Sequence, residues 1–269
     1  MTRAYRRGWA AVVVVATVLL TTGCGSLGRT EDEPVHRAAT ELTAAAAAVR
    51  DARTLRASIE FRQSGGTVLG GGLSGRADVV VGHGVSLTYT YQPSTTVERN
   101  NKNIEGELRT VGDRAFARSS RWKPPAGKEW FSTNPATRAK LDVAVPPEWL
   151  AMTMSKLLDP LFILGQGVAD VPDLTSAPAT VDGVTTTKYM ATWNLTTDGA
   201  GPEMTAWAAR IGDMVSMELS LYLSPEGRPV RLEVNSSTAV MLFDAKVLFS
   251  DYGAAIVVEA PAADRVAQP

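Results

Sequence analysis

LRASIEFR, residues 55–62, alternates one apolar with one polar side chain at every step, and this alternation decides the fold. Successive side chains of a β-strand point to opposite faces of a sheet, so the pattern predicts a strand with one buried face and one solvated face. Residues 86–91, SLTYTY, repeat the pattern with Leu87, Tyr89 and Tyr91 on one face. Because sheets with one solvated face are commonly antiparallel, we expect an antiparallel sheet.

The same period of two returns along the rest of the chain, interrupted by turn residues such as Gly112-Asp113 and the SPEGRP turn at residues 224–229. The further strand-like runs are residues 103–111, 114–121, 185–193, 217–223, 230–234 and 240–253. Strands of this kind, following one another along the chain, predict an antiparallel meander.

Helical patterns accompany these strands. Residues 36–53 are rich in alanine, which has excellent helix propensity, and carry a weakly apolar stripe that includes Leu42, Ala45 and Val49. GPEMTAWAARIG, residues 201–212, resembles a second, shorter helix. Together with the strands, they predict an α+β fold in which a single strongly curved antiparallel sheet wraps over a few helices.

Residues 147–164 form the most apolar stretch of the body, with only Glu148, Lys156 and Asp159 charged. A helix that is apolar on most sides is buried on most sides or lines something apolar, and Pro160 should kink or restart it. Its two methionines would suit a surface that accepts ligands of different shape, although methionine is also ordinary core filler. This segment alone favours plain core over a ligand-lining surface.

The first residues have the layout of an export signal. MTRAYRR is positively charged, and the apolar run from Trp9 to Leu20 is shorter than the roughly 20 residues that a membrane-spanning helix needs. We therefore expect residues 1–23 to be a cleaved signal peptide. Its removal takes away three of the 27 basic residues and none of the 28 acidic ones, which leaves a formal charge of −4. A mildly acidic surface argues against binding to nucleic acid or electrostatic docking to an anionic bilayer.

Cys24 is the only cysteine, and it ends the stretch TTGC, which resembles the lipobox of bacterial lipoproteins. There the cysteine is acylated, with fatty acids such as palmitate, and becomes the new N-terminus. The lipobox usually has Leu where this chain has Thr21. The alternative, a free or disulfide-bonded thiol, lacks a second cysteine and would be a liability in an oxidising compartment. We expect a lipid anchor at Cys24 on the extracytoplasmic face of the cell membrane, a solvated tether over residues 24–35 and one domain over residues 36–269.

Residues suited to catalysis or metal binding are scarce. His36 and His83 are the only histidines, and the chain has no GxSxG, CxxC or HExxH motif, so neither a Ser-His-Asp set nor a histidine metal site is expected. Residues 31–33, EDE, read as a solvated acidic run rather than a calcium site. SGGTVLGGGLSG, residues 64–75, contains G-x-G-x-x-G, but a strand-like run follows it, so we expect a flexible hairpin loop and no phosphate site. We expect no enzyme, cofactor or metal.

WKPPAGKEWF, residues 122–131, is a proline-broken loop bounded by Trp122 and Trp130. Exposed tryptophans there would contact lipid or a partner, but a tryptophan at a strand end more often caps a core. The core interpretation is therefore preferred.

Three stretches together resemble a known family. They are TVDGVTTTKYMATWNL at residues 180–195, SLYLSPEGRPVRLEV at 220–234 and LFSDYGAAIVVEAPAADRV at 248–266. In this order and spacing they are similar to the C-terminal half of the actinobacterial LppX/LprG lipoproteins. The resemblance implies the fold of the lipoprotein carrier LolA, a half-open β-barrel with helices across its mouth. It also implies an apolar cavity for the acyl chains of glycolipids or related envelope lipids.

We thus expect a membrane-anchored lipoprotein that binds the acyl chains of a lipid or glycolipid in an apolar cavity and carries this lipid within the cell envelope. An envelope transporter is a candidate partner. The alternative is a sensor or chaperone module of the same fold that binds a partner protein and has its cavity collapsed into a core. An esterase is disfavoured because no base is available. Alternation and helix pattern give these expected cavity residues: Leu87, Tyr89, Trp149, Met152, Met154, Leu157, Leu158, Leu161, Phe162, Met217, Leu219 and Leu221.

Overall fold

The computed structural model describes residues 32–64, 71–93, 102–133, 147–211, 214, 216–237 and 242–267. Its strands are Thr54–Ser64 (β1), Gly71–Val80 (β2), Gly84–Pro93 (β3), Ile104–Val111 (β4), Arg114–Ser119 (β5), Trp130–Thr133 (β6), Thr175–Val181 (β7), Val184–Asn194 (β8), Ser216–Leu223 (β9), Pro229–Ser237 (β10), Leu242–Ser250 (β11) and Val266–Ala267 (β12). Its α-helices are Asp32–Ala52 (α2), Pro147–Met154 (α3), Pro160–Leu164 (α4) and Pro202–Arg210 (α5). Short 3-10 turns are Ser155–Leu158 (η2), Val168–Asp170 (η3) and Ala263–Arg265 (η4).

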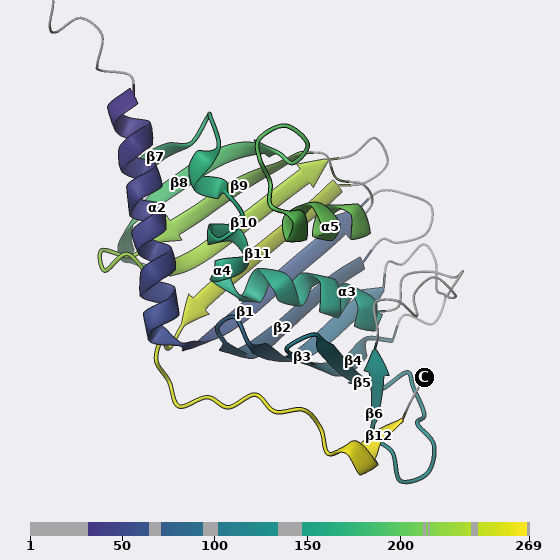
Figure 1. The fold of residues 1–269 in the computed structure, drawn as a ribbon. Helices are drawn as coiled ribbons and strands as arrows, with labels where there is room; N and C mark the ends of the chain where they lie inside the picture. Colours follow the sequence, from purple (N-terminus) through teal and green to yellow (C-terminus); the bar gives the residue numbers. More distant parts are fainter. Residues whose placement is uncertain are drawn as a thin grey trace, which may run out of the picture. The chain divides into compact units, whose positions relative to one another are not determined.

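All the described strands belong to one sheet, in the order β12-β6-β5-β4-β3-β2-β1-β11-β10-β9-β8-β7 (Figure 1). Within it, every pairing is antiparallel except that of β12 with β6. The sheet is curved but unclosed, since β7 and β12 form its two edges and are not paired with each other in the described residues. The α+β class and the single curved antiparallel sheet expected from the sequence are therefore confirmed.

The alternation in β1 explains which face is buried. Leu55, Ile59 and Phe61 are at most 1% exposed, while Arg56 and Glu60 between them face solvent. The pairing of β1 with β11 continues this buried face on the next strand, because Ile59 lies opposite Val247, which is also buried. The apolar residues of successive strands thus form one continuous inner face.

Helices cover that inner face. Figure 1 shows α3, α4 and α5 lying across one side of the sheet. In the compact unit Ala38–Pro269, α2 contributes the predicted stripe, since Leu42, Ala45 and Val49 are buried in the main hydrophobic cluster. No helix of the described segments is both long and apolar enough to span a membrane.

Residues 147–164 form a helix, a 3-10 turn and a second helix in succession. Pro160 is the first residue of α4, where its missing N–H costs nothing, and Asp159 caps that helix by accepting a hydrogen bond from Leu161 N at 3.0 Å. The expected restart at Pro160 is confirmed.

The glycine-rich stretch at residues 64–75 differs in part from its prediction as a hairpin loop. Residues 71–75 belong to β2, and residues 65–70 lie outside the described part of the chain. Glycine is needed in this strand because neighbouring atoms occupy the space of a side chain. A Cβ on Gly75 would lie 2.6 Å from Thr88 O and 2.8 Å from Leu87 Cδ1.

After β11 the chain runs without helix or strand over residues 251–262 and then reaches β12 beside β6. Here Trp130 is buried with Phe116 and Val266 in a second small cluster. Trp122 packs against the main cluster, and its ring meets Phe131 edge to face at 4.9 Å. Both tryptophans thus take part in packing, as the core interpretation expected.

Candidate functional site

The inner face and its covering helices bring most of the expected cavity residues together. Nine are buried in the main hydrophobic cluster, and Met152 and Leu161 are partly buried against it. Trp149 is half-buried and is not a member of that cluster. The buried nine are Leu87, Tyr89, Met154, Leu157, Leu158, Phe162, Met217, Leu219 and Leu221. They come from β3, from the segment α3 to α4 and from β9, and all belong to the one main cluster.

Aromatic rings attach the covering helices to the sheet. Phe162 of α4 meets Trp207 of α5 with ring centroids 5.8 Å apart, Trp207 meets Phe243 of β11 at 6.0 Å, and Phe243 meets Phe61 of β1 at 5.1 Å, all edge to face. Trp207 Nε1 also donates to the carbonyl oxygen of Thr153 at 2.9 Å, which ties α5 to α3. The cavity prediction did not include Trp207 or Phe243, although both lie in segments whose period was recognised.

A polar group is buried at the β3–β5 end of this apolar interior. Glu148, in the first turn of α3, is 1% exposed and accepts a hydrogen bond from Ser119 Oγ at 2.5 Å. Tyr89 is 2% exposed, and burial, followed by the charge of Glu148, raises the pKa of its phenol above the ordinary value. From the sequence, Glu148 was expected only to be one of three charged residues on an apolar helix, and its burial beside Ser119 was not predicted.

Asp159 lies in the same segment, between η2 and α4. Besides capping α4, its Oδ2 accepts a hydrogen bond from Gly82 N, in the β2–β3 turn, at 2.7 Å. Burial raises the pKa of this carboxyl group, and the hydrogen bonds from Gly82 and Leu161 oppose the rise. The covering segment is therefore joined to the sheet by two carboxylates, Glu148 in α3 and Asp159 before α4, and by apolar contacts.

A further polar contact joins α2 to the inner face. The Tyr189 hydroxyl of β8 donates to the Glu41 carboxylate. Tyr189 is buried, and its register partner Leu221 belongs to the expected cavity set. This contact was not predicted, because it joins residues 148 positions apart.

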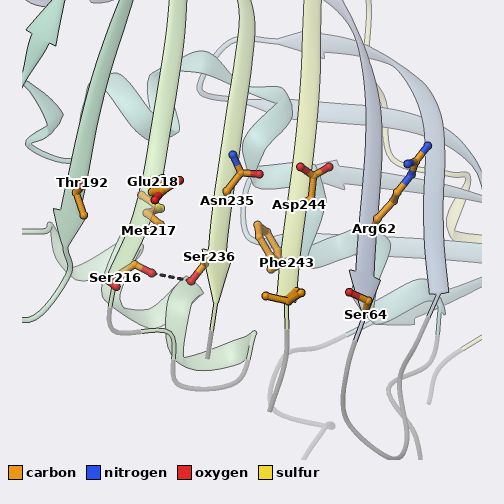
Figure 2. Close-up of a pocket in the computed structure, with 11 residues that line it drawn as sticks. Arg62, Ser64, Thr192, Ser216, Met217, Glu218, Asn235, Ser236, Phe243 and Asp244 are labelled. Atoms are coloured by element: carbon orange, nitrogen blue, oxygen red, sulfur yellow. Dashed lines mark hydrogen bonds between the residues drawn. The ribbon is translucent and has the colours of Figure 1, made fainter. Parts of the chain in front are cut away.

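Two grooves formed by described residues lie at the sheet surface, and both are lined by charged side chains together with apolar ones. Figure 2 shows one of about 570 Å³, where Glu218, Asn235, Asp244 and Arg62 project side by side from neighbouring strands. The other, of about 820 Å³, includes Arg56 with its two carboxylate partners, Asp78 and Asp251. Charged side chains in a groove do not suit an acyl chain. The inner face is lined by the apolar residues of the main cluster and is the candidate site for one.

Groups for metal binding are absent from the parts of the chain that the structure describes: no three His, Cys, Asp or Glu side chains are placed to hold an ion. Cys24, the expected lipidation site, lies outside the described residues.

Comparisons with known proteins find similarity at the level of solved structures. The chain is similar to LprF from Mycobacterium bovis, with 14% identity, a TM-score of 0.47 and coverage of 84% of this chain and 97% of that one. It is similar to the Mycobacterium tuberculosis lipoprotein LppX, with 12% identity, a TM-score of 0.43 and coverage of 82% and 99%. A LolA superfamily protein from Nitrosomonas europaea follows, with 8% identity, a TM-score of 0.31 and coverage of 79% and 90%. The resemblance to LppX-type lipoproteins is thus found again. No family model and no curated protein matches the sequence.

Proposed function

We propose that this chain is a membrane-anchored extracytoplasmic lipoprotein that binds the acyl chains of a lipid or glycolipid between the inner sheet face and α3 to α5, and carries it within the cell envelope. The observation that carries the proposal is the continuous apolar inner face, covered by a segment that is itself apolar and broken into short helices. The resemblance of three C-terminal stretches to the LppX/LprG lipoproteins agrees with this role.

The size of the hydrophobic effect explains why such an interior is required. Exposing an acyl chain to water costs about 0.8 kcal/mol per methylene, or on the order of 12 kcal/mol for a chain of about 16 carbons. A carrier must offer an equally apolar surface. Leu157, Leu158 and Leu219 contribute to such a surface, since all three are at most 2% exposed in the main cluster. The segment from α3 to α4 would have to move to admit the chain.

The anchor would be the acylated Cys24. One acyl chain of myristoyl length gives only marginal membrane binding, so stable attachment needs more than one hydrophobic signal. The several acyl chains typical of lipoproteins meet that need. The tether was expected over residues 24–35, but α2 already begins at Asp32. The residues between Cys24 and Asp32 would then let the domain reach lipid in the adjacent membrane.

Native mass spectrometry with lipid extraction tests the proposal, using the full chain produced in an actinobacterial host. We expect a stoichiometric acylated ligand that is lost in Leu158→Trp and Leu221→Trp, because both replacements add bulk to the interior. Leu242→Trp is the matched control, since Leu242 is 58% exposed at the groove of Figure 2. A stable protein that carries no lipid and takes up no fluorescent lipid would refute the carrier role.

The second candidate is the sensor or chaperone module that binds a protein partner. The observation in its favour is that the nine buried cavity residues already pack against one another and the helices. In that case cavity-filling replacements would leave partner binding intact, while replacement of the half-buried Trp122 would weaken it. Trp130 is too deeply buried to serve as a contact.

A further inference from the structure

Tyr89, Gly106 and Ser119 lie in one row across three neighbouring strands. Tyr89 of β3 pairs with Gly106 of β4, and Gly106 pairs with Ser119 of β5. A Cβ on Gly106 would lie 2.4 Å from both Cζ and Oη of Tyr89. The phenol ring therefore lies over the backbone of Gly106, which has no side chain. Its hydroxyl group extends from β3 over β4, toward Ser119 on β5.

Glu148 of α3 reaches the same place from the helix layer. Its Oε1 is occupied by the hydrogen bond from Ser119, but its Oε2 and the Tyr89 hydroxyl are buried and have no hydrogen-bond partner. Native proteins leave few buried polar atoms unpaired, so this open donor and this open acceptor require an explanation. The Tyr89 hydroxyl belongs to the row that ends at Ser119, and Ser119 is the residue that bonds Glu148. A ligand group that pairs with both supplies one.

The chemistry of the two open atoms restricts that group. A phenol O–H donates, whereas a carboxylate only accepts, so the missing group must accept one hydrogen bond and donate another. An alcohol hydroxyl does both. A fully ionised phosphate or carboxylate headgroup has no proton to give Glu148 and would be repelled by its charge.

We propose that Tyr89 and Glu148 bind a hydroxyl of an uncharged lipid headgroup, so that the protein selects neutral hydroxylated lipids over phospholipids with the same chains. This inference rests on the proposed carrier function. The adjacent row of the sheet, Leu87, Leu108 and Ala117, is fully buried and apolar. It would contact the acyl chain where it leaves the headgroup.

Displacement of diphenylhexatriene, a fluorescent hydrocarbon without polar groups, tests the proposal on the full chain. The competing probes are dioleoylglycerol and dioleoylphosphatidic acid, which share their acyl chains and differ only in hydroxyl against phosphate. We expect at least tenfold tighter binding of dioleoylglycerol. Tyr89→Phe should weaken that binding about fivefold, the effect of one hydrogen bond, which is more than it weakens the binding of diphenylhexatriene.

Glu148→Gln keeps the shape of the side chain and removes its charge. It should reduce the preference against dioleoylphosphatidic acid about tenfold. Tyr222→Phe is the matched control, because Tyr222 bonds Glu233 on the opposite face of the sheet, and it should bind all probes as the wild type does. If Glu148→Gln does not fold, Tyr89→Phe tests the site by itself.

The outcomes separate this inference from the function on which it rests. One outcome is that the protein takes up diphenylhexatriene, binds the two lipids with equal affinity, and shows the same affinities in Tyr89→Phe. This outcome would overturn the hydroxyl site and leave the proposed carrier function intact. A protein that takes up neither lipid nor diphenylhexatriene would overturn both.

Discussion

Gly106→Ala tests the placement of the Tyr89 ring on which the polar site depends. The new methyl group would lie 2.4 Å from Cζ and Oη and 2.8 Å from Cε1 of Tyr89, whereas carbon atoms in contact are normally about 3.5–4.0 Å apart. The ring must therefore move by roughly 1 Å in a place where Tyr89 is fully enclosed. Overpacking of a well-filled core costs about 1–3 kcal/mol.

We expect Gly106→Ala to lower the free energy of unfolding by about 2 kcal/mol, measured by urea denaturation, which corresponds to a fall in Tm of about 4–8 °C for a domain of this size. In a Tyr89→Leu background the ring is gone, and the same change should cost under about 0.5 kcal/mol. Gly72→Ala is the control, because its Cβ would meet only Phe61 O, at 3.3 Å. An equal cost in both backgrounds would show that the ring does not lie over Gly106.

Three further predictions concern the covering segment and the anchor. Because burial raises the pKa of Asp159 in the folded state, its protonated form favours folding. The free energy of unfolding should then decrease as the pH rises from about 4 through the raised pKa, and Asp159→Asn should remove this slope in urea titrations; equal slopes would contradict it. Trp207→Phe should lower the free energy of unfolding by about 1–3 kcal/mol, since it leaves the buried carbonyl of Thr153 without its donor. Trp122→Phe at the half-buried control position should cost less, and the reverse order would count against the role of this hydrogen bond. Cys24→Ser should move the protein from the membrane fraction to the soluble fraction on cell fractionation, and an unchanged membrane fraction would exclude the lipid anchor.

Local pattern was enough to predict the fold. The period of two at residues 55–62 depends only on neighbours in the chain, so it revealed which side of β1 is buried. Pro160 and Asp159 are equally local signals, and the restart of the helix occurs at Pro160.

The polar site could not be predicted in the same way, because it depends on register between strands. Tyr89 and Gly106 become neighbours only when β3 pairs with β4, and Glu148 meets Ser119 only when α3 covers β5. The prediction of a loop at residues 71–75 was wrong for the same reason. Alone, the glycines there are typical of a flexible loop, but the missing side chains of Gly71 and Gly75 make room for residues on β3. Contact of the cavity residues with lipid stays a prediction.

The position of β1 has a consequence for how the chain folds. This early strand lies at the centre of the sheet, where one side pairs with β2 and the other with β11, for example Arg56 with Ser250. A chain made from its N-terminus onwards therefore holds a central strand with an open hydrogen-bonding edge until almost the whole sequence has been synthesised. Such a high contact order implies slow folding and a long-lived open edge. The loss of β11 alone would split the sheet into two halves, each with an exposed strand where the continuous inner face had been.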